Sequence, residues 1–200
     1  MAPVIVDPDR VHEFADAASF YRWLSVNHDR EPEVWIKIHK KASGLPTISP
    51  DEAIDASLCW GWIDAIRKSF DETSFLQRYT PRGAKSVWSQ VNVEKVARLT
   101  AAGRMTEHGL KPVKAAKADG RWDAAYRVST AEVPEDFRKA IAKSNEAQAM
   151  FETLTAQNRF ALIFRLMQIK TEAGRKKKIA DFVAMLARGE TIHPQGKRAR

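Results

Sequence analysis

The sequence predicts an α+β fold: a small, mainly antiparallel sheet packed with helices, followed by an all-helical C-terminal module. About three segments in the first part of the chain alternate apolar and polar side chains, as half-buried strands do. Capped segments with helical periodicity separate them, which favours α+β over a wound parallel sheet. From about Val133 onward only helical periodicity remains. We therefore divide the chain into an α+β domain over residues 1–128, a helical module over 129–190 and a basic tail over 191–200.

The first two elements are a helix and a strand. Asp16 is a favourable N-cap for a helix that carries Phe20 and Leu24 at helical spacing. The segment "VWIKIHK" at 34–40 then alternates apolar residues with Lys and His, which is the period of a half-buried strand.

The next helix has the most complete start signal in the sequence. Ser49 is the N-cap, Pro50 takes the first helical position and Glu52 closes a capping box. We expect this helix to run from about Pro50 to Trp60 and to end at Gly61.

A β-hairpin and two helices follow. Residues 62–70 and the segment "SFLQRYT" alternate on either side of the turn "DET". Ser89 can cap a helix that ends at Gly103, and a further helix is expected from about Thr106 to Ala118. In the C-terminal module, four more helix starts are indicated at Pro134, Asn145, Thr155 and Thr171.

The composition is globular, and its charge is uneven. The 200 residues are 44% hydrophobic and 29% charged, with a net charge of +8. Residues 1–100 hold 13 Lys/Arg against 14 Asp/Glu, whereas residues 101–200 hold 20 against 11. The densest basic run is Arg175, Lys176, Lys177 and Lys178. Such a run can bind nucleic acid or an anionic surface, or it can be a solvated helix face.

Several kinds of chemistry find no support in the sequence. The nine Gly form neither a dinucleotide-binding fingerprint nor a phosphate-binding loop, so no cofactor is expected. The five His never pair at helical spacing, and the single Cys59 cannot build a thiolate site, so no metal is expected. Cys59 itself is expected to be buried and inert. No catalytic residue is assigned, and the chain leans toward a non-enzymatic role.

The compartment is predicted from the first residues. "MAPVIVDPDRVHEF" has neither a basic start nor a long apolar run, so a secretory signal is not expected. No apolar stretch is long enough to insert into a membrane, and one Cys fits a reducing compartment. These features predict a cytoplasmic protein, and they indicate no oligomeric state.

The hairpin is the one segment that gathers charged and aromatic residues. With a tight turn at "DET", we expect Asp64 to lie opposite Thr80 and Trp62 to lie near Arg82. A slip of one residue in the pairing would exchange the faces of the second strand. On the expected register one face carries four residues: Trp62, Asp64, Arg78 and Thr80.

We predict that this face binds a small, anionic ligand. The predicted binding residues are Trp62, Asp64, Arg78, Arg82 and Trp88. The two arginines would neutralise the ligand, Asp64 would orient Arg78, and the tryptophans would exclude water. The free amides of the helix capped by Ser89 would add to the attraction. Alternatively, Asp64 and Arg78 form only an ion pair and the tryptophans belong to the core.

At these residues the sequence closely resembles the YdeI/OmpD-associated, or bacteriocin-protection, family. The segments that carry the resemblance over about residues 14–194 are "WLSVNH", "VWIKIHKKASG", "SPDEAIDASLCWGWIDAIRKSFD", "RYTPRGAKSVWSQVN", "LTAAGRM" and "KTEAGRKKKIADFVAMLARGE". The most specific parts are "GWID", "TPR" and the set Ser86, Trp88, Ser89 and Asn92. The resemblance implies a stress or antimicrobial-protection role, association with an outer-membrane porin and no known catalytic mechanism. The leading expectation is therefore a non-enzymatic binding protein, and the alternative is a nucleic-acid or anionic-surface module.

Overall fold

The structure is a computed structural model, and it describes residues 4–126 and 132–195. The chain forms two compact units, Met1–Ala125 and Tyr126–Arg200, which are treated separately below. The predicted α+β class is confirmed: the first unit has a sheet with helices, and the second is helical. The domain boundary predicted at 128/129 lies outside the described residues, and the predicted basic tail is described only as far as Gln195.

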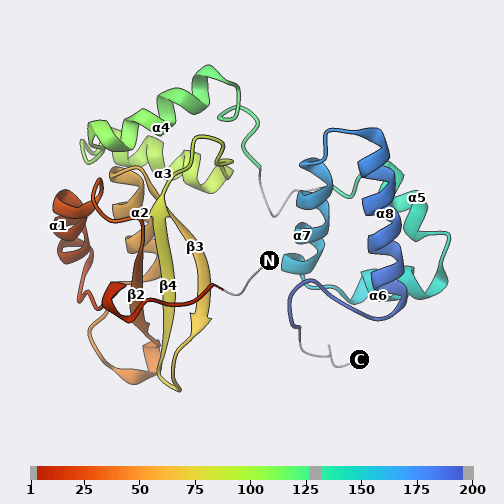
Figure 1. The fold of residues 1–200 in the computed structure, drawn as a ribbon, viewed down its shortest axis with the longest axis horizontal. Helices are drawn as coiled ribbons and strands as arrows, with labels where there is room; N and C mark the ends of the chain where they lie inside the picture. Colours follow the sequence, from red (N-terminus) through yellow and green to blue (C-terminus); the bar gives the residue numbers. More distant parts are fainter. Residues whose placement is uncertain (1–3, 127–131, 196–200) are drawn as a thin grey trace. The chain divides into compact units, whose positions relative to one another are not determined.

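The first unit combines a four-stranded sheet with four helices (Figure 1). The strands are β1 (Val11–His12), β2 (Val34–His39), β3 (Trp62–Ser69) and β4 (Ser74–Pro81). The helices are α1 (Ala17–Asn27), α2 (Pro50–Cys59), α3 (Gln90–Ala101) and α4 (Glu107–Ala118), with single 3-10 turns at Pro8–Arg10 and Lys41–Ser43.

The sheet has the strand order β1-β2-β4-β3, and its hairpin strands are antiparallel as predicted. β2 is antiparallel to β4, whereas β1 is parallel to β2. The sequence did not indicate β1, because a strand of two residues shows no alternation. The sheet is therefore mixed, with one short parallel edge.

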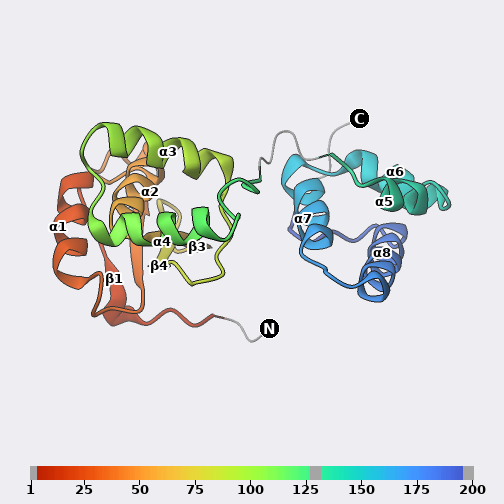
Figure 2. The same ribbon diagram turned by 90° about the horizontal axis from the view of Figure 1, so that it is seen from above.

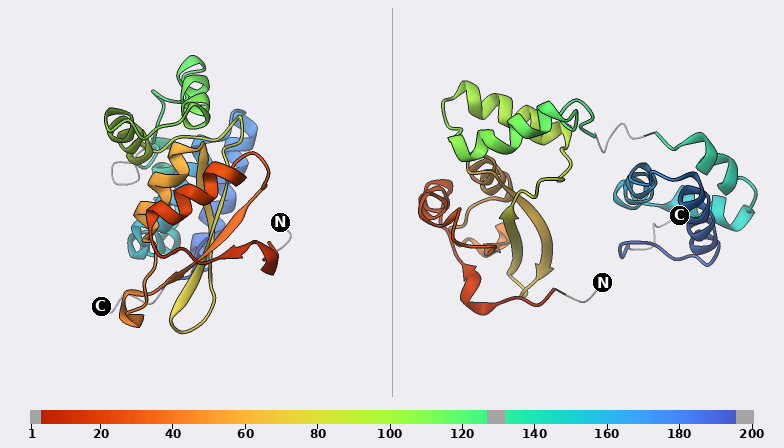
Figure 3. Two further views of the ribbon diagram at one scale, coloured as in Figure 1. Left: turned by 90° about the vertical axis from the view of Figure 1, so that its left-hand side faces the viewer. Right: turned by 45° about the horizontal axis from the view of Figure 1, so that its top comes forward.

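α1 and α2 cover one face of the sheet (Figure 3). Phe20 and Leu24 of α1 are fully buried against Val34 and Ile36 of β2. Burying such side chains contributes about 1.5–3 kcal/mol each, so this layer stabilises the unit. Trp35 is also fully buried, although its neighbours on β2 point to the opposite face. The strand is therefore covered on both sides there, and not half-buried as its pattern predicted.

The predicted helix starts are largely as the sequence indicated. Asp16 accepts a hydrogen bond from the Ser19 amide at 2.7 Å. The capping box of α2 is complete: the Glu52 amide donates to the Ser49 hydroxyl, and the Ser49 amide donates to the Glu52 carboxylate. The expected N-cap at Asn145 is wrong by one residue, because the Ser144 hydroxyl accepts from the Ala147 amide.

The hairpin register differs from the predicted one by one residue. Asp64 lies opposite Tyr79 and not opposite Thr80, and the pairing shifts again between Asp64 and Arg67. Successive side chains of a strand point to opposite faces, so this slip moves Arg78 and Thr80 to the face away from Asp64. The predicted shared face of the hairpin is therefore wrong.

α3 and α4 lie beyond the end of the sheet where β3 begins (Figures 1 and 2), and α2 packs against both of them. The approach of α4 to the end of α2 is very close. A Cβ atom on Gly109 would lie 2.3 Å from the carbonyl oxygen of Cys59, and one on Gly61 would lie 2.7 Å from that of His108. Gly61 also has a φ of +76°, which favours glycine. These two glycines permit α4 to start directly over the α2–β3 junction.

The second unit is a four-helix arrangement within its described residues. Its helices are α5 (Glu135–Ile141), α6 (Asn145–Thr153), α7 (Ala156–Met167) and α8 (Glu172–Ala187). α8 packs against the other three, and Phe137, Leu166 and Leu186 are fully buried in the shared core. Across the described parts of both units, no helix is both long and apolar enough to span a membrane.

Candidate functional site

One cavity of the first unit lies beneath the start of α4. It measures about 430 Å³, which is within the range of ~300–1,000 Å³ typical of ligand pockets. Five segments line it: the end of α1, the α2–β3 junction, the loop between β4 and α3, α4 itself, and the turn after α4 that carries Arg121. We call it the α4 cavity. Its walls are mostly apolar, formed by Trp60, Trp62, Pro81 and Pro112.

Three aromatic rings meet at one side of the α4 cavity. The ring centroids of His28 and His108 are 4.0 Å apart, and those of His28 and Trp60 are 4.7 Å apart. His108 also lies nearly parallel to Trp60, at an interplanar angle of 23°. His108 is exposed, whereas His28 and Trp60 are half-buried beneath it.

Two buried polar atoms in this cluster have no hydrogen-bond partner among the described residues. They are Nε2 of His28 and Nε1 of Trp60. Leaving such an atom without a partner costs about 1–3 kcal/mol, so each of the two atoms would gain from a polar group that reaches it. By contrast, the indole N–H of Trp62 is satisfied, because it donates to the His28 carbonyl oxygen at 3.0 Å.

The rim of the α4 cavity is cationic. Arg82, Lys111 and Arg121 line it, and Asp29 is the one acidic residue among the described lining residues. Arg121 is held in place by Asp119, with Nε 2.8 Å from Oδ2, and by the Ser86 carbonyl oxygen. Within the described residues, the exposed Lys111 forms no hydrogen bond or ion pair. The rim therefore favours an anion, and Lys111 can contact it without losing another partner.

The structure brings together only part of the site predicted from the hairpin. Trp62 and Arg82 both line the α4 cavity. Trp88 is buried behind them and supports Arg82, whose guanidinium carbon lies 3.6 Å from the centroid of the Trp88 ring. Asp64 and Arg78 do not line this cavity.

Arg78 has a different partner from the one predicted. Its Nε donates to Oε2 of Glu33 at 2.6 Å, and its Nη2 also contacts that oxygen. Glu33 in turn accepts a hydrogen bond from the indole of the buried Trp35. The expectation that Asp64 orients Arg78 is therefore wrong, and Arg78 serves to hold Glu33 beside the sheet.

The sequence did not single out several residues of the cavity, among them His28, His108, Lys111 and Arg121. His28 ends α1 and His108 begins α4, 80 positions later, so no spacing rule connects them. The local signals that bear on the cavity are Gly61 and Gly109, whose lack of a side chain permits the close approach of α4. Glycines at helix ends are too common to reveal such a contact by themselves.

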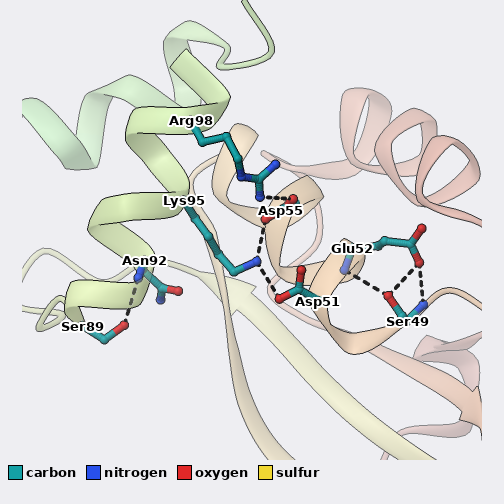
Figure 4. Close-up of polar contacts among 8 residues, drawn as sticks. All are labelled: Ser49, Asp51, Glu52, Asp55, Ser89, Asn92, Lys95 and Arg98. Atoms are coloured by element: carbon teal, nitrogen blue, oxygen red, sulfur yellow. Dashed lines mark hydrogen bonds and ion pairs between the residues drawn. The ribbon is translucent and has the colours of Figure 1, made fainter. Parts of the chain in front are cut away.

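A second group of charged residues joins α2 to α3 (Figure 4). The Lys95 ammonium lies 2.7 Å from Asp51 and 2.8 Å from Asp55, and Arg98 lies 2.6 Å from Asp55. Burial opposes the charge of Asp55, but the hydrogen bonds from Lys95 and Arg98 outweigh it and lower the pKa of this carboxyl group. All the charges are matched, so this cluster is a structural contact and not a ligand site.

The basic run of α8 is also matched by carboxylates. Arg175 contacts Asp136 of α5, Lys176 contacts Glu172, and Lys177 contacts Asp181. Lys178 lies 3.9 Å from Asp181. Exposed pairs of this kind are weak, so they leave the nucleic-acid alternative as a prediction.

The described residues offer no obvious reacting group. No set of three His, Cys, Asp or Glu side chains in the described ranges could hold a metal ion. Burial raises the pKa of the Cys59 thiol to about 11, so this thiol is protonated at neutral pH.

The fold and the cavity define a two-part protein: an α+β unit with a cationic pocket and a separate helical unit. Two family models match the chain. One, described as a domain of unknown function (DUF8412), matches residues 12–112, and the other, described as bacteriocin-protection, YdeI or OmpD-associated, matches residues 130–189. No curated protein and no solved structure matches it.

The chain therefore belongs to the DUF8412 family and carries a bacteriocin-protection, YdeI or OmpD-associated domain after it. These matches confirm the resemblance found in the sequence, and they divide its segments between two families. The segments "GWID" and "TPR" lie within the first match, together with all the described lining residues of the α4 cavity except Ala115 and Arg121. The basic run of α8 lies within the second.

Proposed function

We propose that this protein binds a small anionic ligand in the α4 cavity. One observation carries the proposal: a largely apolar cavity has a cationic rim and two buried polar atoms without partners in the described chain. Apolar walls with a few convergent polar groups are the usual composition of a ligand site. Trp62 and Arg82 of the site predicted from the sequence belong to it.

The binding role is non-enzymatic and cytoplasmic in this proposal. The chemistry of the cavity supports a non-enzymatic role, because its described lining groups are suited to hold an anion. The nearby Cys59 thiol is protonated and so is not an activated nucleophile. The second family is described as bacteriocin-protection, which supports a stress or antimicrobial-protection role.

Isothermal titration calorimetry of the whole protein tests the proposal at low ionic strength. The probes are inorganic phosphate and ribose 5-phosphate. Lys111→Ala removes the one rim cation that has no other partner in the described chain, and we expect about tenfold weaker binding.

Lys114→Ala is the matched control. It removes the same charge from the same helix, three residues further on, where the side chain is exposed and does not line the cavity. Equal loss of affinity in the two variants would mean that overall charge, and not the cavity, attracts the anion. If neither probe binds the native protein, the proposal is rejected.

A further inference from the structure

We propose that this protein has a second ligand site, which binds an organic carboxylate with an apolar body. The site is a cavity of about 570 Å³ between the loop that joins β2 to α2 and the strands of the hairpin. We call it the β2–α2 cavity. It goes beyond the proposed function, because its described lining residues include none of those that line the α4 cavity.

The wall of the β2–α2 cavity is largely apolar, and its charged groups have one sign. Four of its apolar side chains are Ile38, Leu45, Ile48 and Phe75. Its cations are Lys40, Lys41 and Arg67, and no acidic residue is among the described residues that line it. Leu45 is 54% exposed, so an apolar ligand in the cavity covers a side chain that otherwise lies in water.

The first two acidic residues of α2 do not compete for these cations. α2 starts at the edge of the cavity with Ser49 and Pro50, and Asp51 and Glu52 follow. Asp51 lies 2.7 Å from the Lys95 ammonium, and the Glu52 carboxylate accepts hydrogen bonds from Ser49. The cavity therefore keeps its positive charge.

A β-bulge places Arg67 on the side of the sheet where this cavity lies. Asp64 lies opposite Tyr79 and Arg67 lies opposite Gln77, so three steps along β3 match two along β4. Strict alternation would put Asp64 and Arg67 on opposite faces of the sheet. The extra residue puts both on the face of the core residue Tyr79, which α1 and α2 cover. Bulges of this kind often re-aim a side chain next to a functional site.

The buried side chain of Gln77 holds both the bulge and Arg67. Gln77 is only 4% exposed, and its Nε2 donates to the carbonyl oxygens of Ala65 at 3.2 Å and Ile66 at 3.4 Å, the two residues within the bulge. Its Oε1 accepts a hydrogen bond from Nε of Arg67 at 2.9 Å. Arg67 is therefore fixed in place before any ligand arrives, which lowers the entropy cost of binding.

The fixed guanidinium of Arg67 is suited to a carboxylate. Its carbon lies 4.3 Å from the centroid of the Phe75 ring, and its Nε is used by Gln77. The two terminal nitrogens form no hydrogen bond or ion pair within the described residues, and such a pair matches the two oxygens of a carboxylate. Lys41 adds a positive charge that is exposed and has no described partner either. The apolar body of the ligand then packs against Phe75 and Leu45.

Isothermal titration calorimetry of the whole protein tests the site with four probes. Octanoate carries both the carboxylate and the apolar body, acetate lacks most of the body, and octan-1-ol lacks the charge. Octyl phosphate exchanges the carboxylate for a phosphate. We expect octanoate to bind about tenfold more tightly than acetate or octan-1-ol, because only octanoate uses both the arginine and the apolar wall. Octyl phosphate should bind no more tightly than octanoate, since one arginine fork matches one planar carboxylate.

Substitutions of Arg67 test the charged contact. Arg67→Ala should weaken octanoate binding about tenfold, and Arg67→Lys should weaken it nearly as much, because an ammonium group has no fork. Lys68→Ala is the matched control. It removes the same charge from the next residue of β3, which lies opposite Leu76 on the other face and does not line the cavity, so octanoate binding should not change.

Leu45→Ser tests the apolar contact at an exposed loop position. It should weaken octanoate several-fold and leave acetate unchanged, because only octanoate reaches the apolar wall. Circular dichroism of each variant checks that it folds.

The possible results separate this inference from the proposed function. If inorganic phosphate binds and depends on Lys111 while octanoate does not bind, the proposed function stands and the second site is refuted. Octanoate that is weakened by Lys111→Ala and not by Arg67→Ala would lie in the α4 cavity, which also overturns the second site. Equal losses in Arg67→Ala and Lys68→Ala would mean attraction by overall charge alone. Tighter binding of octyl phosphate than of octanoate would refute a carboxylate in favour of a phosphate ester.

Discussion

Two groups of ion pairs, one in each unit, show how differently the same residue types act. Between α2 and α3, the side chains of Lys95 and Asp55 are each only 10% exposed. On α8, the side chain of Lys177 is 77% exposed beside Asp181. The basic run on α8 is the more conspicuous in the sequence. The Lys95–Asp55 pair between α2 and α3, however, is the one that is largely shielded from water. Burial, and not the density of charge, therefore decides which of these ion pairs is costly to break.

Removing the Asp55 carboxylate is expected to have the largest effect on stability. Asp55→Ala leaves the buried Lys95 with only Asp51 as a partner, and we expect the free energy of unfolding of the first unit to fall by about 3 kcal/mol. All six Trp belong to this unit, so denaturation followed by Trp fluorescence reports on it alone.

Asp51→Ala is the control for that variant. It removes a carboxylate from the same lysine, but the Asp51 side chain is 77% exposed, so a loss below about 1 kcal/mol is expected. Equal losses in the two variants would contradict the role given to burial. Replacing both members, as Asp55→Leu with Lys95→Met, should restore most of the stability.

Acid breaks the same contact without a mutation. Because the pKa of Asp55 is lower in the folded protein than in the unfolded chain, the unfolded chain binds the proton more readily. The stabilisation is complete above the ordinary Asp value of about 4 and is lost as the pH falls through the folded value. The stability difference between the native protein and Asp55→Asn should therefore shrink below about pH 4. A difference that stays constant down to pH 2.5 would exclude Asp55 as its origin.

The smallest changes in the free energy of unfolding are expected for substitutions on α8, and their size differs along the basic run. Arg175 makes two contacts to Asp136 and one to the Leu166 carbonyl oxygen, with a side chain that is 28% exposed. Arg175→Ala should cost the second unit about 1 kcal/mol, whereas Lys177→Ala should cost less than about 0.5 kcal/mol. Far-UV circular dichroism measures both, and an unchanged Trp transition confirms that the first unit is unaffected.

The lysines of the run also test the nucleic-acid alternative. Lys176, Lys177 and Lys178 can be changed to Gln together, with little expected loss of stability. If the native protein shifts an oligonucleotide in a gel and this variant does not, the alternative gains support. A shift that survives the change, or no shift at any salt concentration, would remove it.

The helices were readable from the sequence because their signals are local. A cap and its amide partner lie within three residues of each other, as at Asp16 and Ser49, so the sequence contains both members of the contact. β1 was missed because it exists only through its pairing with β2. The hairpin itself was predicted, but its register was not, because a shift between Asp64 and Arg67 changes the pairing without changing the alternation.

By itself, the sequence determined the fold class, the positions of most helix starts and the presence of a hairpin with Trp62 and Arg82 at its ends. Those features depend on neighbours along the chain, so periodicity and capping are enough to predict them. Only the tertiary structure decided that His28 and His108 meet over Trp60, and that Arg78 turns to Glu33 instead of Asp64. Those contacts join residues 45 to 80 positions apart. They depend on how closely whole elements pack, which no local pattern records.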